Sequence, residues 1–256
     1  MTSWLVAHRG ASHDAPESTL SAFRLAWDQG ADGIEADFFL TGDQRIVCIH
    51  DRNTLALSGV DLEVAHATLA ELKQLDVGIR QGEAWRGERI PAIEEVLAVI
   101  PPDKKFFIEL KSGPEIVAPL ASVLQASTLA SDQVYVISFN EETLIECKRL
   151  LPNVRTHWLS FFFPDVPTGG WTPTALDVAA ALRRTQANGF GGQCHPDGFN
   201  ASFVGALRAA GYSEFHVWWV NDVQAARFYQ DLGALSLTTS CPAKLRAELN
   251  TTPEAG

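Results

Sequence analysis

The chain contains 256 residues, of which 46% are hydrophobic and 20% charged, and this composition excludes a disordered, a collagen-like and a membrane-spanning protein. Its 31 acidic and 20 basic residues give a formal net charge of −11, which argues against a nucleic acid or an anionic membrane as partner because phosphate binding requires a basic surface. A small solute is the partner that we expect.

The N-terminal segment Met1–Gly10 has no basic region ahead of its short apolar run, so we expect a cytoplasmic protein without stable insertion into a membrane. Beyond it, short apolar runs alternate with helical patterns, which is typical of repeated βα units. The expected strands are Trp4–His8, Gly33–Leu40, Ile46–His50, Phe106–Leu110, Val134–Phe139, Thr156–Ser160, Phe190–Cys194, Phe215–Val220 and Leu235–Thr239. The expected helices are Leu20–Trp27, a helix with Ile93, Val96, Leu97 and Ile100 on one face, Glu141–Leu151, Ala175–Ala187, Ala201–Ala210 and Val223–Leu232. The four cysteines lie far apart and are expected to be reduced thiols.

These strands are one more than a closed barrel of eight requires. The second and third are joined only by Thr41–Arg45, whereas a parallel crossover needs a dozen or more residues. The short link therefore predicts a hairpin with Gly42 and Asp43 at its turn, and it leaves the strands of an α/β fold, a (β/α)8 TIM barrel with a β-hairpin arm. We expect residues 1–256 to form a single barrel domain, in which 51–89 is a small loop-rich insertion.

Acidic residues fall in or at the ends of two of the expected barrel strands, and the carboxyl ends of barrel strands carry the active sites of barrel enzymes. Glu35 and Asp37 lie two residues apart, as do Glu109 and Lys111, so each pair shares one face of its strand. The three carboxylates suit a hard divalent cation, Mg²⁺ or Ca²⁺. The alternative is that they only form salt bridges with Arg9 and Lys111, although uncompensated carboxylates inside apolar strands are costly to bury.

Two histidines and two cations accompany these acids. His8 ends the first strand and His50 ends the antiparallel arm, and we interpret them as an acid–base pair because imidazole suits proton transfer near neutral pH. Arg9 and Lys111 suit an anionic substrate, which we expect to carry a phosphate group. Glu17 opens the first helix, where it either orients Arg9 or only interacts with the helix dipole. The remaining histidines are interpreted as structural: His13, His66, His157, His195 and His216.

In order and spacing, these residues resemble the glycerophosphodiester phosphodiesterase family of the bacterial cytoplasmic type. The family signature corresponds here to His8-Arg9-Gly10, Glu17-Ser18-Thr19, Glu35-Ala36-Asp37, His50-Asp51 and Glu109-Leu110-Lys111. Similarity in Ile90–Leu97 and in Trp218–Asn221 extends the resemblance over nearly the whole chain. Each motif alone is weak, but five in this order make a specific signal.

The resemblance implies metal-dependent hydrolysis of a small glycerophosphodiester to sn-glycerol 3-phosphate and an alcohol. The residues that it implies are His8 and His50 as acid and base, Glu35, Asp37 and Glu109 as ligands of the divalent cation, Arg9, Lys111 and Trp218 as substrate contacts, and Glu17 and Asp51 as their supports. Three positions depart from the family pattern: Ser18 replaces Asn, Ala92 replaces Thr, and Ser240 stands where Asp usually closes the last strand. The last departure puts substrate preference or barrel closure in question.

Other functions compete with this one. A lysophospholipase D-like or phosphatidylinositol phospholipase C-like phosphodiesterase would use a related barrel, so the identity of the substrate is the softer expectation. A barrel glycosidase with Glu35 and Glu109 as its carboxylates would leave both cations and both histidines unexplained. A non-catalytic scaffold would need a damaged site, for which Ser240 alone is insufficient. Barrel architecture by itself decides between none of them.

The segment Trp158–Pro173 follows an expected strand and is too apolar for an ordinary loop. Its aromatic residues, Phe161, Phe162, Phe163 and Trp171, would form an exposed lip on the active-site face. Either they pack beneath the loop or in the interface of a homodimer, or they line the alcohol side of the substrate pocket.

Overall fold

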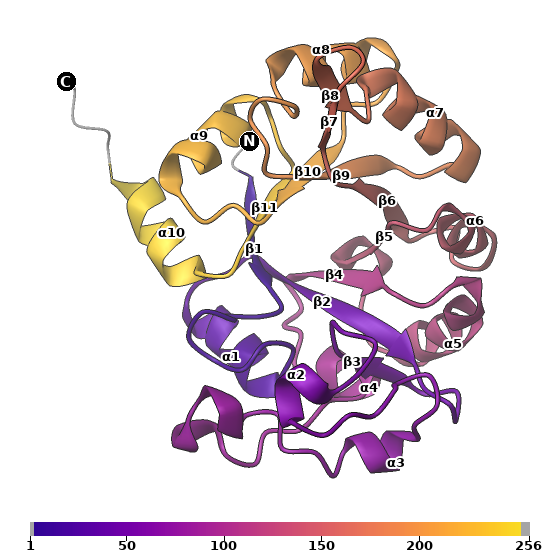
Figure 1. Ribbon diagram of the computed structural model, residues 1–256, viewed down its shortest axis with the longest axis vertical. Helices are drawn as coiled ribbons and strands as arrows, with labels where there is room; N and C mark the ends of the chain where they lie inside the picture. Colours follow the sequence, from indigo (N-terminus) through magenta and orange to yellow (C-terminus); the bar gives the residue numbers. More distant parts are fainter. Residues whose placement is uncertain (1–2, 252–256) are drawn as a thin grey trace.

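A closed barrel of parallel strands forms the centre of the molecule, as the computed structural model of residues 3–251 shows (Figure 1). Within these residues the barrel strands are β1 (Trp4–His8), β2 (Gly33–Leu40), β4 (Lys105–Leu110), β5 (Val134–Ser138), β6 (Arg155–Ser160), β9 (Gly189–Gln193), β10 (Phe215–Trp218) and β11 (Ser236–Thr239). Their hydrogen-bonded order is β1-β11-β10-β9-β6-β5-β4-β2, and pairing of β1 with β2 closes the ring. The predicted (β/α)8 barrel is confirmed.

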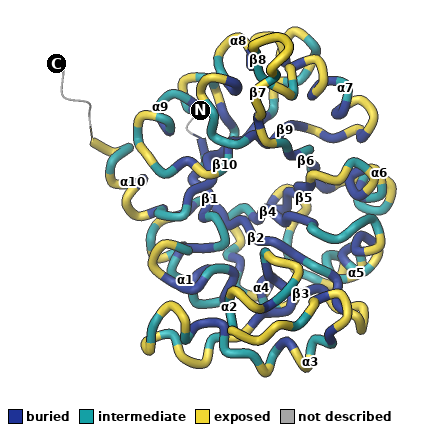
Figure 2. The backbone as a smooth tube through the Cα atoms, viewed as in Figure 1, coloured by how far each residue is buried: buried dark blue, intermediate teal, exposed yellow. Residues whose placement is uncertain are grey.

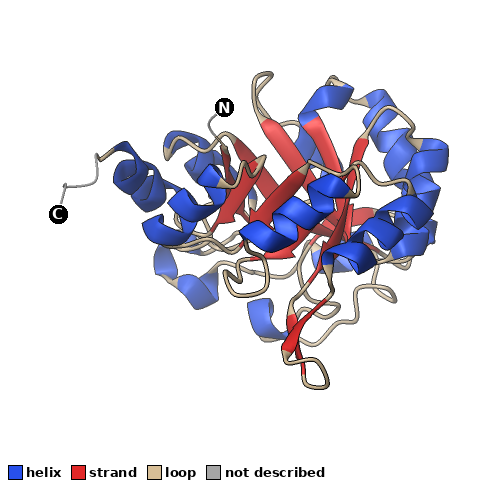
Figure 3. Ribbon diagram, turned by 90° about the horizontal axis from the view of Figure 1, so that it is seen from above, coloured by secondary structure: helices blue, strands red, loops and turns tan. Residues whose placement is uncertain are grey.

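Helices surround the strands on the outside (Figure 3). They are α1 (Leu20–Asp28), α4 (Ile93–Leu97), α5 (Val117–Ala126), α6 (Glu141–Leu150), α7 (Ala175–Thr185), α8 (Ala201–Ala209), α9 (Val223–Asp231) and α10 (Pro242–Asn250). Most of them lie within two residues of the predicted boundaries. The helices α5 and α10 are absent from the prediction, although Pro242 at the first position of α10 is a helix-start signal.

The predicted hairpin arm is confirmed. Strand β3 (Ile46–Cys48) pairs antiparallel with β2, with Phe38 opposite Cys48 and Leu40 opposite Ile46. The amide of Gln44 donates to the carbonyl of Thr41, which places Gly42 and Asp43 at the turn. Gln44 itself has a φ of 61°, the left-handed residue that follows the turn in a three-residue hairpin loop.

The insertion after this arm is short of regular structure, as predicted. It contains only single-turn helices: α2 (Leu55–Ser58), α3 (Leu69–Leu72), η1 (Ile79–Gln81) and η2 (Glu83–Trp85). Its buried residues Val64, Leu72 and Val77 pack with Val47 and Ile49 of the arm in a separate hydrophobic cluster. The insertion is therefore anchored to the barrel through β3.

A second hairpin follows β6 where a loop was expected. Strand β7 (Phe163–Asp165) pairs antiparallel with β8 (Gly170–Thr172), outside the barrel sheet. The remaining short elements are the 3-10 turns η3 (Pro114–Ile116) and η4 (Ser131–Gln133). This second hairpin raises the number of strands above the nine that the sequence predicted.

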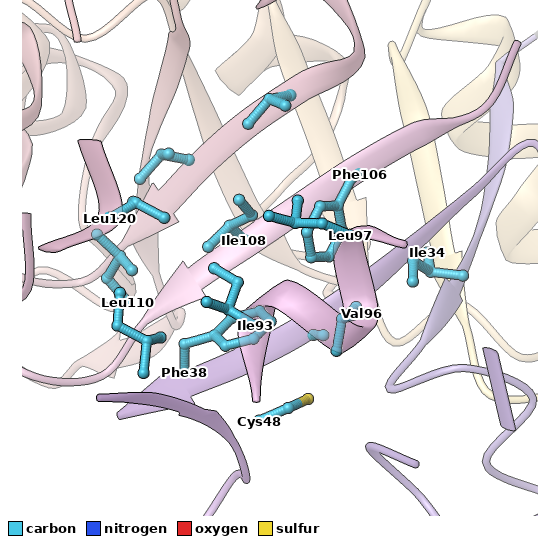
Figure 4. Packing of buried hydrophobic residues seen from close by; sticks show 14 of the residues in the cluster. Ile34, Phe38, Cys48, Ile93, Val96, Leu97, Phe106, Ile108, Leu110 and Leu120 are labelled. Carbon is cyan, nitrogen blue, oxygen red and sulfur yellow. The ribbon is translucent and has the colours of Figure 1, made fainter. Parts of the chain in front are cut away.

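The main hydrophobic core lies between the outer faces of the strands and the helices that cover them, where the backbone is buried (Figure 2). Figure 4 shows Ile93 and Val96 of α4 packed toward Phe38 of β2 and Phe106 of β4. The predicted helical face is buried along its whole length, yet α4 ends at Leu97 because two prolines follow Ile100 and disfavour helix before them.

None of the helices within residues 3–251 has the length and apolar composition that a membrane span requires.

Candidate active site

Adjacent strands bring the predicted acidic residues together. The register places His8 of β1 beside Glu35 of β2, and Asp37 of β2 beside Glu109 of β4. All three acids are buried, and each offers a carboxylate oxygen within 4.8 Å of the others. Because alternate residues of a strand share a face, Glu35 and Asp37 both point into the barrel.

The turn after β1 explains the His-Arg-Gly motif. Arg9 has a φ of 56° and Gly10 a φ of 80°, and the amide of Arg9 donates to the backbone carbonyl of Glu35 at 2.9 Å. A Cβ atom at position 10 would lie 2.7 Å from the backbone of Ala22, so only glycine fits between the turn and α1. The turn directs the arginine back toward β2.

The two cationic side chains that the sequence assigned to the site, those of Arg9 and Lys111, form ion pairs with the acidic cluster. Asp37 forms ion pairs on both sides, with its Oδ2 3.2 Å from Arg9 Nε and its Oδ1 3.0 Å from Lys111 Nζ, and Lys111 also pairs with Glu109. The guanidinium of Arg9 further donates to both oxygens of Glu17, at 3.1 and 3.2 Å. The salt bridges that the sequence left as an alternative are thus present, and Glu17 contacts Arg9 directly.

These ion pairs leave the cluster with excess negative charge, because four carboxylates face only two cations. Burial, together with Asp37, raises the pKa of Glu109 to about 7, and burial with Asp37 and Glu109 raises the pKa of Glu35 well above its ordinary value. Glu35 Oε1 is buried and has no hydrogen-bond partner within residues 3–251. A hard divalent cation fits this donor set, since it would supply both the missing charge and a partner for that oxygen.

The two predicted histidines reach the same region from different sides. His8 Nε2 lies 3.9 Å from Glu35 Oε2, and its Nδ1 lies 3.5 Å from Ser240 Oγ. Burial, followed by the charge of Arg9, lowers the pKa of His8 to about 4. His50 Nδ1 lies 2.8 Å from a carboxylate oxygen of Asp51. Asp51 therefore contacts only one of the two ring nitrogens of His50, and the other nitrogen, Nε2, does not take part in this contact.

A cavity of about 510 Å³ at the carboxyl ends of the strands joins these residues. Apart from His216 of β10, its ionisable lining comes from β1, β2, β4 and the segments that follow β1, β3 and β4: His8, Arg9, His13, Glu17, Glu35, His50, Glu109 and Lys111. Its apolar lining comes from β5, β6, β10 and the segments that follow them: Ile137, Phe139, Leu159, Phe161, Trp218 and Trp219. The cavity therefore has a charged half and an apolar half, set by the order of the strands. Asp37 and Asp51 are outside the lining and act on it through their partners.

The structure also adds residues that the sequence interpretation missed. Ser240 lies beside His8, and His216, interpreted as structural, lines the cavity. His216 Nδ1 is 2.8 Å from His157 Nδ1, and the two rings meet across β9. A Cβ on Gly191 would lie 2.4 Å from His216 Nε2, so the glycine-rich sequence of β9 was the available signal for this contact.

The aromatic segment after β6 divides between the two functions considered for it. Phe162 is buried against Phe199 and Phe203 of the α8 region, and Trp171 packs on His195 with ring centroids 4.1 Å apart. Phe161 instead lines the cavity. Adjacent residues thus take opposite sides of the chain.

A family model described as "Glycerophosphoryl diester phosphodiesterase family" matches residues 8–244, a range that contains every residue lining the cavity, from His8 to Ser240. The chain belongs to this family. The match confirms the family that the five motifs predict.

Relatives within the glycerophosphoryl diester phosphodiesterase family agree with the assignment. A glycerophosphodiester phosphodiesterase of Caldanaerobacter subterraneus is 39% identical over 161 residues, which cover 60% of this chain and 65% of that protein, just under two thirds of its length. One of Bacillus altitudinis is 31% identical over 71% of this chain and 82% of its own. A phosphodiesterase of Oleispira antarctica, solved in complex with the product sn-glycerol-3-phosphate, is 27% identical and covers 98% of both chains with a TM-score of 0.84.

Proposed function

We propose that the protein hydrolyses glycerophosphodiesters to sn-glycerol 3-phosphate and an alcohol. The observation that carries the proposal is a single cavity in which a carboxylate cluster, two cations and two histidines meet. The sn-glycerol-3-phosphate bound by the Oleispira antarctica neighbour supports the same product here. A glycosidase would need only the carboxylates and would leave the cations without a task.

In this proposal Glu35, Asp37 and Glu109 hold a divalent cation, Mg²⁺ or Ca²⁺. Once bound, the cation would neutralise charge on the phosphoryl oxygens and orient the phosphate. The unpartnered oxygen of Glu35 and the raised pKa values of Glu35 and Glu109 support the assignment.

Arg9 and Lys111 contact the phosphate in the proposed complex, and Trp218 contacts the rest of the substrate. Glu17 and Asp37 hold the guanidinium of Arg9 from two sides, so that its direction is fixed before substrate binds. Lys111 is fixed in the same way by Asp37 and Glu109. Preorganised positive charge of this kind stabilises the negative charge that develops on a phosphoryl group.

The proposed chemical step transfers two protons through His8 and His50. One imidazole takes the proton of the attacking hydroxyl while its oxygen bonds to phosphorus, and the other gives a proton to the alkoxide as the bond from phosphorus to the alcohol breaks. Asp51 accepts from His50 Nδ1 and leaves its Nε2 directed elsewhere. The attacking hydroxyl belongs to water or to the substrate's own glycerol, and a cyclic phosphate detected by phosphorus NMR would identify the second route.

The direct test is release of glycerol 3-phosphate from a panel of glycerophosphodiesters, assayed with Mg²⁺, with Ca²⁺ and with excess chelator. We expect turnover with a cation and its loss in chelator. Absence of glycerol 3-phosphate from every substrate would contradict the proposed reaction, whereas full activity in chelator would contradict only the cation.

A further inference from the structure

The apolar half of the cavity continues onto the outer surface. We call Phe139, Phe161, Trp218 and Trp219 the aromatic wall. Three of these side chains are exposed to solvent, with exposed fractions of 37% for Phe139, 41% for Phe161 and 57% for Trp219. Phe163 of β7 extends the wall, with its ring centroid 6.0 Å from that of Phe161, and it is 57% exposed. Exposed apolar surface that joins a binding cavity marks a place where a ligand is covered from water.

The backbone holds Trp219 at the rim in an unfavourable conformation. Its φ is 68°, in the left-handed region that a bulky residue rarely adopts. The peptide groups on both sides are fixed, because the carbonyl of Trp218 accepts from Cys194 N at 2.9 Å and Val220 N donates to Thr238 O at 2.8 Å. Strained residues held in this way by their surroundings are concentrated at ligand sites.

The wall suits an aliphatic chain better than a polar or cationic group. Among its four side chains only the two indole N–H groups can hydrogen-bond, so glycerol hydroxyls placed along it would lose most of their partners. A quaternary ammonium is bound best by several ring faces that surround it, whereas Phe139 and Phe161 turn one face each toward the other at 5.1 Å and Trp218 meets Phe161 edge-on at 5.0 Å. A methylene chain makes non-directional contacts, so it needs neither hydrogen-bond partners nor surrounding ring faces.

We propose that the aromatic wall binds an aliphatic chain carried by the glycerophosphodiester substrate. The inference rests on the proposed function, since the charged half must hold the phosphate for the chain to lie along the opposite half. The chain could be attached to the alcohol or to the glycerol, and both attachments would cross the wall from the cavity toward Phe163.

The experiment compares kcat/KM, followed by phosphorus NMR, for substrates that stay monomeric in solution. Glycerophosphoethanol and glycerophosphohexanol vary the alcohol, and glycerophosphocholine and its 1-hexanoyl ester vary the glycerol. Each methylene that the wall removes from water should raise kcat/KM roughly two- to fourfold, so one of the two longer substrates should exceed its partner by about tenfold or more. The pair that responds identifies where the chain is attached.

Variants of the wall connect this response to its residues. Phe161→Ser should bring the ratio of long-chain to short-chain kcat/KM close to one, and Phe161→Leu should retain most of it. Leu176→Ser, at a more exposed apolar position on α7 and outside the cavity, should leave the ratio unchanged.

Two results would overturn the inference while the proposed function stands: hydrolysis of glycerophosphocholine without any gain from either chain, or an unchanged ratio in Phe161→Ser. A dimer that Phe161→Ser dissociates, seen by size-exclusion chromatography with light scattering, would show that a second copy covers the wall and would also overturn it. Failure to hydrolyse any of the four substrates would instead refute the proposed function.

Discussion

The two histidines of the cavity differ in their surroundings, yet the proposed reaction needs both. His8 is held between Glu35 and Ser240, while His50 is held by Asp51. A general acid or base contributes roughly 10²–10⁴ in rate, so His8→Ala and His50→Ala should each lower kcat by about that factor with the fold intact. Steady-state assays with circular dichroism measure this.

The matched control for the histidine variants is His66→Ala, an exposed histidine of the insertion that should retain full activity. Asp51→Asn should cost less than His50→Ala, because it removes only the group that orients the ring. A nearly unchanged kcat in either cavity variant would contradict the assignment of that histidine.

The buried oxygen of Glu35 that lacks a partner predicts how the protein responds to cations. In wild type, a cation that binds only the folded state should raise both the free energy of unfolding and the melting temperature. At a hundredfold excess of cation over Kd, the gain in the free energy of unfolding is about 2.7 kcal/mol. Glu35→Gln should lose at least half of this gain, since it removes one ligand and one charge from the cluster.

Without cation, Glu35→Gln should melt no lower than wild type in chelator, because it removes excess buried negative charge. Differential scanning calorimetry with and without Ca²⁺ measures both effects. The exposed Glu63→Gln serves as control and should keep the whole cation-induced shift. An undiminished shift in Glu35→Gln would argue against this residue as a ligand.

At the scale of single elements, the start of α4 is incompletely capped. Ala92 has the extended conformation of an N-cap residue, but its side chain accepts nothing, and only Glu95 closes the turn by accepting from the amide of Ala92 at 2.7 Å. Ala92→Ser supplies the missing acceptor and should raise the free energy of unfolding by about 1 kcal/mol.

Urea denaturation at fixed pH measures the effect of Ala92→Ser. The inverse change at α7, Thr174→Ala, removes a complete capping box and should lower stability by about the same amount. No gain from the added hydroxyl would show that the buried site has no room for it.

The buried contact between His157 of β6 and His216 of β10 predicts that the protein loses stability in acid. Burial lowers the pKa of His157 and lowers that of His216 well below its ordinary value, whereas in the unfolded chain both titrate near 6.5. Below about pH 6.5 the unfolded state therefore binds more protons than the folded state, and the free energy of unfolding falls as the pH decreases. Above about pH 6.5 both states keep these histidines neutral, and this loss of stability is absent.

Urea midpoints at pH 7.5, 6.5 and 5.5 should show this decline. His216→Leu removes one of the two groups and should make the decline shallower, by up to about 1.4 kcal/mol per pH unit. An identical slope in the variant would mean that other groups cause the acid sensitivity.

At the scale of the whole molecule, the insertion and the barrel share one cluster of buried residues. Val47 and Ile49 of the arm pack with Val64 and Leu72 of the insertion, and β3 is paired with the barrel strand β2. We therefore expect residues 1–256 to unfold as the single domain that the sequence predicts, in one transition at which far-UV circular dichroism and tryptophan fluorescence coincide. Two separated transitions would assign the insertion a stability of its own.

The sequence by itself determined the barrel and predicted most of the charged residues that the structure brings together in the cavity. Barrel strands are buried on both faces and appear as continuous apolar runs, so β1 and β2 were predicted to the residue. The five-residue link between β2 and β3 admitted only a hairpin. Strand alternation then required Glu35 and Asp37 to share a face, because that relation is local to the backbone.

Only the tertiary structure decided how these residues are partnered. Asp37 contacts both cations because β1, β2 and β4 are neighbours, and the cavity has an apolar half because β5, β6 and β10 follow around the ring. Phe161 and Phe162 have the same side chain, but Phe161 lines the cavity and Phe162 is buried. The difference depends on Phe199 and Phe203, which lie far along the chain and pack against Phe162. Contacts between distant segments are set by packing, which a local sequence pattern does not encode.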